Sequence, residues 1–72
     1  MCRSIKPLFN TTPPPTDDQV QAAALQFVRK ISGYRVPSKI NQPAFDQAVT
    51  DIAASSQHLL AALRTASPPR PA

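Results

Sequence analysis

Cysteine and histidine are almost absent from this sequence: Cys2 is the single cysteine and His58 the single histidine. One cysteine cannot form an internal disulfide. A closed metal site takes about four ligands, most often cysteine and histidine side chains, so the sequence predicts no metal. With one glycine, Gly33, the chain also lacks a glycine-rich phosphate loop, and no bound cofactor is expected.

Long apolar runs are missing as well, which excludes two kinds of membrane-directed segment. No stretch reaches the roughly 20 apolar residues of a transmembrane helix. Arg3 and Lys6 near the start are not followed by the apolar region of a secretion signal. We therefore expect a cytoplasmic protein without a membrane partner, in which Cys2 stays a free thiol.

The chain is also short, and its charge is one-sided. A domain of 72 residues buries only about 60% of its unfolded surface, so its core is marginal. Without a disulfide or a metal, association is the remaining way to add stability. Eight Lys and Arg against four Asp and Glu give a net charge of +4. Nucleic-acid binders share this balance, but so do basic proteins that bind nothing acidic.

Nine prolines divide the chain into three regions. The prolines at 13–15 close an N-terminal arm over residues 1–15, and those at 68, 69 and 71 mark a proline-rich tail over residues 66–72. Two amphipathic segments lie between them, and they predict helices over residues 16–32 and 42–65.

The first helical segment has a start, a face and a stop that agree. Thr16 and Gln19 have the spacing of a capping box, and Gly33 suits the left-handed residue that ends many helices. Arg29 and Lys30 fall in the last turn, where the helix dipole favours cations. The apolar face expected at helical spacing consists of Val20, Ala23, Ala24, Phe27, Val28 and Ile31.

The second helical segment starts at a turn and ends before a proline. Asn41 is predicted as its N-cap, and Pro43 falls in the first turn, where a missing N–H costs little. The helix should end near Thr65, because Ser67 precedes a proline. Its apolar stripe consists of Phe45, Ala48, Val49, Ile52, Ala53, Ser56, Leu59, Leu60 and Leu63.

Together the two segments predict an all-α fold, an antiparallel two-helix hairpin. Ile5, Leu8 and Phe9 of the proline-rich arm are expected to pack on its open side. A four-helix bundle from two copies would bury both stripes better, so a homodimer stays open beside a monomer. The stripes form either a core or a docking face for a larger partner, and the small Ala53 and Ser56 permit close helix approach.

Three stretches of the sequence resemble a known family. They are the start "MCRSIKPLFN", the block "PPPTDDQVQAAALQFVRKISG" and the segment "PSKINQPAFDQAV". With this spacing the chain resembles the small bacterial proteins grouped as domain of unknown function 2277. The resemblance implies a small, mostly helical protein and no particular activity. This chain differs at Ser4, where members usually have Asn, at Pro43, and in its shorter tail.

Positive charge concentrates around the predicted loop. Arg29, Lys30 and Gly33 are explained by helix chemistry, but Arg35 and Lys39 are not. In an antiparallel hairpin these cations meet beside the N-terminus of the second helix, a place that suits an anion. The candidate residues for anion or nucleic-acid binding are Arg29, Lys30, Tyr34, Arg35, Ser38, Lys39 and Asn41.

The kind of contact follows from what the loop contains. It is longer than the turn of a DNA-reading helix-turn-helix, and neither helix is rich in base-reading side chains. Phosphate contact is therefore favoured over sequence-specific reading, and Tyr34 adds a face on which a base can stack. The competing interpretations are a solvated loop that binds nothing and a site for a protein partner.

Cys2 is the weak candidate for catalysis. Removal of Met1 would leave an amine and a thiol on one residue, a pair that acts as a nucleophile with its own base. No histidine or carboxylate in the arm completes a dyad, so an unreactive chain end is the competing interpretation.

His58 is the remaining titratable candidate. It faces outward by helical phase, and the antiparallel layout lets Asp17 or Asp18 approach it or Arg64. A solvated histidine near a helix C-terminus is the competing interpretation.

These observations predict a non-enzymatic helical interaction module whose basic loop contacts nucleic acid or a nucleoprotein partner. The alternative is a small thiol protein or enzyme that uses an N-terminal Cys2. A third hypothesis is a structural subunit that folds only within a complex.

Overall fold

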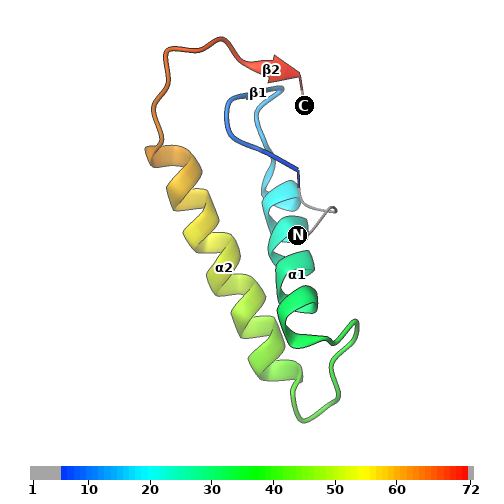
Figure 1. The fold of residues 1–72 in the computed structure, drawn as a ribbon. Helices are drawn as coiled ribbons and strands as arrows, with labels where there is room; N and C mark the ends of the chain where they lie inside the picture. The colour runs from blue at the N-terminus through cyan, green and yellow to red at the C-terminus, as the bar shows by residue number, and fades with distance from the viewer. Residues whose placement is uncertain (1–5, 72) are drawn as a thin grey trace.

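The fold is a pair of antiparallel helices tied together at the end away from their connecting loop. The computed structural model describes residues 6–71. Helix α1 spans Asp17–Ser32 and helix α2 spans Gln42–Ala62, and they run side by side in opposite directions (Figure 1). Two short strands, β1 (Thr11–Thr12) and β2 (Arg70–Pro71), meet at the far end. The predicted all-α hairpin is confirmed.

Local chemistry fixes both ends of α1. The Gln19 amide donates to Thr16 Oγ1 at 3.2 Å, and the Thr16 amide donates to Gln19 Oε1 at 2.8 Å, which completes the capping box. Gly33 follows the helix with φ 77°, and its N–H donates to the carbonyl of Arg29. The predicted cap and stop of this helix are both confirmed.

The ends of α2 differ from the sequence prediction. Asn41 occupies the N-cap position, but its backbone is helical (φ −98°, ψ −5°) and its side chain makes no capping hydrogen bond. The helix ends at Ala62 rather than near Thr65, because Leu63 turns to an extended backbone (ψ 146°) that leads the tail back toward the arm. Arg64 Nη1 lies 3.5 Å from the Ala61 carbonyl, one of the acceptors that the helix end leaves unpaired.

The core is a single narrow seam between the two helices. Its buried members are Val20, Ala24, Val28, Phe45, Val49 and Ala53. Leu8 of the arm packs against this seam, and Phe9 is half-buried, whereas Ile5 lies outside the described residues.

The predicted stripes are wider than the seam that forms, so the interpretation of the stripes as core holds for only part of each stripe. Phe27, Ile31, Leu59 and Leu63 remain 42, 67, 57 and 39% exposed. A helix packed against one neighbour buries mainly the residues that point directly at it, and the flanks of an apolar stripe about 100° wide need a further partner.

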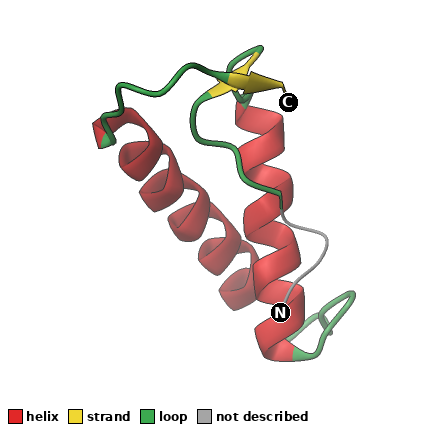
Figure 2. Cartoon of the chain, turned by 45° about the horizontal axis from the view of Figure 1, so that its top comes forward, coloured by secondary structure: helices red, strands yellow, loops and turns green. Residues whose placement is uncertain are grey.

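The strand pair and its neighbours form a terminal clasp, residues 10–12 with 67–71, which the sequence did not reveal. The strands are parallel, with Thr11 opposite Arg70 and Thr12 opposite Pro71. Asn10 Nδ2 lies 3.3 Å from the Ser67 carbonyl and 3.2 Å from that of Pro68. The arm and the tail therefore hold each other at the end opposite the loop (Figure 2).

Neither helix within residues 6–71 combines the length and the apolar character needed to cross a membrane.

Candidate nucleic-acid interface

The basic loop, residues 29–41, is held in shape by hydrogen bonds within itself. Its chain leaves α1 at Gly33, and the Tyr34 amide donates to Ser32 Oγ at 3.2 Å. Before α2, the Asn41 amide donates to the carbonyl of Ser38 at 3.0 Å. The loop therefore closes with local turns at both of its ends, which define the path of its backbone there.

Arg29 joins the two sides of the basic loop. Its Nε donates to the carbonyl of Arg35 at 3.1 Å, so this side chain supports the loop as well as complementing the α1 dipole. The contact uses one of the guanidinium nitrogens, and no other hydrogen bond engages this group among the described residues. Arg29 is half-buried, which fits a residue that both supports the loop and offers charge at its edge.

The other three cations are free to meet a ligand. Lys30, Arg35 and Lys39 are all exposed. Over residues 6–71 no ion pair with an aspartate holds any of the loop cations, and Asp46 is the nearest acidic residue along the chain on the α2 side. The basic loop therefore carries uncompensated positive charge.

The N-terminus of α2 directly follows the basic loop and has no capping side chain. The side chain of Asn41 does not cap the helix, because its Nδ2 is directed to the Tyr34 hydroxyl at 3.4 Å. Proline in the first turn has no N–H, and the Phe45 amide already donates to the Asn41 carbonyl at 2.9 Å. The amides of Gln42 and Ala44 are left without a capping side chain, and such amides bind anions.

The structure brings some predicted residues together and leaves others apart. Arg29 contacts Arg35, Tyr34 contacts Asn41, and the backbone of Ser38 bonds to that of Asn41. Lys30 and Lys39 have no contact of this kind with the others in the described part of the chain.

Two apolar residues of the basic loop were missed by the sequence prediction. Val36, which precedes Lys39 in the chain, is 74% exposed, and Ile40, which follows it, is 87% exposed. Tyr34 is 45% exposed. The sequence does indicate them, because these two β-branched residues lie in the loop and belong to neither apolar stripe. They make the surface between the cations partly apolar.

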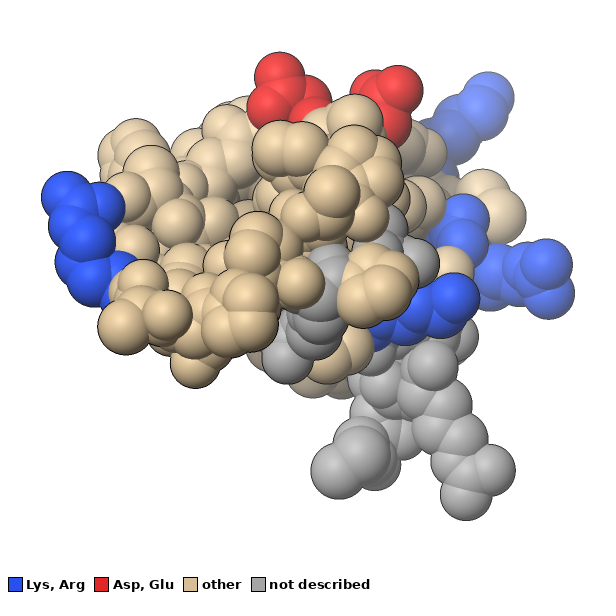
Figure 3. All heavy atoms as spheres, turned by 90° about the horizontal axis from the view of Figure 1, so that it is seen from above, with Lys and Arg blue, Asp and Glu red and all other residues tan. Residues whose placement is uncertain are grey.

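The acidic residues lie outside the basic loop, and Asp46, the nearest one in the chain on the α2 side, accepts a hydrogen bond from Gln42 Nε2 at 2.8 Å. In the view along the hairpin from the terminal clasp, the acidic side chains in sight gather along one edge, and the basic side chains project mainly at the two sides (Figure 3). Asp17 Oδ1 accepts a hydrogen bond from Gln57 Nε2 at 3.2 Å. Asp17 thus reaches the residue that precedes His58, but no hydrogen bond or ion pair joins Asp17 or Asp18 to His58 or Arg64 among residues 6–71.

The weak candidate for catalysis, Cys2, lies outside the described residues. In the part of the chain that the structure describes, no three His, Cys, Asp or Glu side chains are grouped as a metal site would require.

One hollow lies between the helices, away from the basic loop. It has a volume of about 240 Å³ and is lined by Ala23, Ala24, Phe27, Ile52 and Ser56. Ligand pockets usually measure about 300–1,000 Å³ and hold a few polar groups that orient the ligand. This hollow is smaller and mostly apolar, so a small-molecule site is not favoured here.

Comparison with known protein families identifies the family of this chain. The family model described as "Uncharacterized conserved protein (DUF2277)" matches residues 1–72, which confirms the resemblance noted in the sequence. No curated protein and no solved structure shows a significant match to the chain.

Proposed function

We propose that this chain, which belongs to the DUF2277 family of uncharacterized conserved proteins, is a non-enzymatic helical interaction module whose basic loop contacts nucleic-acid phosphates. One observation carries the proposal: four cations, none of them in an ion pair among residues 6–71, lie in the loop that leads into the N-terminus of α2, where Asn41 makes no capping hydrogen bond. We expect it to act in the cytoplasm, either on nucleic acid directly or on a nucleoprotein partner.

The chemistry of the basic loop favours a single strand over a duplex. Cations and free helix amides bind phosphate without reading sequence. The exposed ring of Tyr34, with Val36 and Ile40 beside the charges, offers an apolar surface on which unpaired bases can stack. A duplex keeps its bases stacked internally and would use only the charges.

The other predicted roles have less support. Self-association, predicted from the apolar stripes, is part of this proposal and is developed below. A thiol protein or enzyme built on Cys2 stays a prediction, and no observation in residues 6–71 favours it.

The proposal is tested by a salt titration with two double variants of equal charge change. Lys30→Ala with Lys39→Ala removes two exposed cations of the basic loop, and Lys6→Ala with Arg64→Ala removes two exposed cations outside it. Affinity for mixed-sequence RNA and DNA would be measured by fluorescence anisotropy at several salt concentrations.

We expect the loop variant to bind more weakly to every sequence. Its plot of log K against log salt should flatten by about 1.4 on single strands, because each phosphate contact contributes about 0.7 there and about 0.9 on duplex DNA. The control should keep most of the affinity. Equal losses in the two variants would mean that net charge alone binds the nucleic acid, and unchanged binding in the loop variant would refute the assignment of the site.

A further inference from the structure

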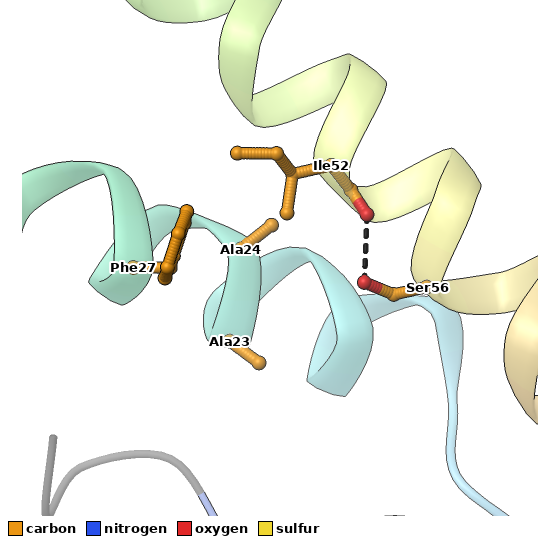
Figure 4. Close-up of a pocket in the computed structure, with 5 residues that line it drawn as sticks. All are labelled: Ala23, Ala24, Phe27, Ile52 and Ser56. Atoms are coloured by element: carbon orange, nitrogen blue, oxygen red, sulfur yellow. Dashed lines mark hydrogen bonds between the residues drawn. The ribbon is translucent and has the colours of Figure 1, made fainter. Parts of the chain in front are cut away.

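One side of the hairpin presents an apolar surface that no described part of the chain covers. In Figure 4, Ala24 and Ile52 point toward each other across the two helices, and Phe27 stands at the edge of the hollow between them. Ile31 continues the α1 side one turn further, and Leu59 continues the α2 side. We call this surface the flank face; its residues are Ala23, Phe27, Ile31, Ile52, Ser56 and Leu59.

The flank face can be buried without leaving a polar group unpaired. None of its side chains is charged, and its one polar side chain is already satisfied. Ser56 Oγ donates to the Ile52 carbonyl at 2.7 Å within its own helix (Figure 4). Ala23 and Ser56 are also small, so another helix can approach closely at the middle of the face.

The exposed area of the chain leaves room for a partner on this face. A compact protein of 7.8 kDa is expected to expose roughly 4,400 Å² by the scaling of surface with mass. This chain exposes 5657 Å² and measures 46 × 22 × 17 Å. The excess is distributed over the whole elongated chain, and it is larger than the roughly 800 Å² that each partner contributes to a standard protein–protein interface.

The small size of the core also favours a partner on the flank face. It has six buried hydrophobic residues, and among the described residues no large side chain is completely buried. A second hairpin on the flank face would turn the narrow seam into the core of a four-helix bundle, which buries both edges of each apolar stripe. A second copy of this chain presents the same uncharged surface and so matches it by composition.

We propose that the flank face binds the flank face of a second copy, forming a two-fold symmetric four-helix bundle. The inference deepens the self-association in the proposed function and rests on it. In a two-fold interface each contact occurs twice, so Phe27 of each copy meets the region of the hollow in the other. Four cations on each basic loop repel those of the other copy, which favours an arrangement with the loops at opposite ends of the bundle.

Sedimentation equilibrium tests the face with matched glutamate substitutions. Leu59→Glu places a charge on the flank face at a residue 57% exposed in the single chain, so the hairpin itself should tolerate it. Ala54→Glu places the same charge at an exposed position of the same helix outside the flank face. On α1 the same comparison is made between Phe27→Glu, on the flank face, and the separate control Ala22→Glu, at an exposed position outside it. Circular dichroism checks that each variant stays helical.

We expect the native chain and the two alanine-site controls to sediment at twice 7.8 kDa, and the Leu59→Glu and Phe27→Glu variants to sediment as single chains. A native chain that remains single near 1 mM, where a dimer with a Kd of about 1 mM would be substantially formed, would overturn the proposal and leave the face to a different protein. Dimers that survive both flank-face substitutions would overturn it too.

The arrangement of the copies is tested separately by measuring the distance between spin labels with double electron–electron resonance. A spin label would be placed at Lys39→Cys, with Cys2→Ser to remove the native thiol. Loops at opposite ends predict a separation comparable to the 46 Å long dimension of one chain, and a separation well under half that length would overturn the arrangement. Nucleic-acid binding by Leu59→Glu is measured in parallel: a single chain that still binds through Lys30 and Lys39 shows that loss of the dimer is distinguishable from loss of the nucleic-acid site.

Discussion

The end of α1 gives the sharpest quantitative prediction, because a single residue determines it. Gly33 has φ 77°, in the left-handed region that an L side chain adopts only with strain. A Cβ built at this position meets no atom within 4 Å. Substitution by alanine therefore tests backbone strain alone, without a steric clash.

The size of the effect is that of the backbone strain, because no steric clash adds to it. Placing an L residue in the left-handed region costs about 1–2 kcal/mol, and no packing term is added. We expect Gly33→Ala to lower the free energy of unfolding by that amount. Each 1 kcal/mol corresponds to a fall in melting temperature of about 4–8 °C for a domain of this size. Gly33→Asn is the matched control, since asparagine adopts this conformation more readily and should lose less.

Urea and thermal unfolding, followed by circular dichroism at fixed protein concentration, would measure both variants. A loss below about 0.3 kcal/mol would mean that α1 does not end in a strained turn, and a loss above about 3 kcal/mol would mean that the added methyl meets something, contrary to the open space around Gly33. Equal losses for alanine and asparagine would also refute the reasoning, because the two differ mainly in their tolerance of positive φ.

Two further predictions concern the core and the terminal clasp. Phe45→Ala should lower the free energy of unfolding by about 3–5 kcal/mol, because Phe45 is only 8% exposed, in a chain whose total stability is on the order of 4–11 kcal/mol. Phe27→Ala should cost less in the single chain, because Phe27 is 42% exposed. An equal cost of the two variants at low protein concentration would contradict the narrow seam between the helices. Asn10→Ala should hasten proteolysis of residues 66–71, because it removes the side chain that reaches the Ser67 and Pro68 carbonyls, while global stability falls by less than about 1 kcal/mol. A tail that is cleaved no faster in this variant would show that the clasp does not depend on Asn10.

The features that the sequence predicted correctly depend on neighbours in the chain. Thr16 and Gln19 form their reciprocal hydrogen bonds within one turn, and Gly33 ends α1 through a bond to Arg29 four residues earlier. Such contacts need only a helical backbone between the partners, so spacing alone indicates them.

The features that it missed depend on residues far apart or on a loop conformation. Asn10 reaches carbonyls more than fifty positions away, and no local pattern marks that pairing. Asn41 has the residue type of an N-cap, but the path of the loop brings its amide to the Tyr34 hydroxyl instead. In the same way, the charge of the basic loop was evident from composition, whereas the support of Arg35 by Arg29 required the loop geometry.

The width of the apolar stripes explains why the core prediction was right about composition and wrong about burial. Helical spacing identifies which residues avoid water, but the number of neighbouring helices decides how many of them are covered. In α1 one neighbour covers Val20, Ala24 and Val28 and leaves Phe27 and Ile31 exposed. A sequence selected only for a two-helix hairpin would need no apolar residue at these flanking positions, and lysine or glutamate there would favour solubility. That Phe27 and Ile31 are apolar while the outward-facing positions of both helices are polar or small is therefore an argument from the sequence itself that the hairpin has a partner on this side.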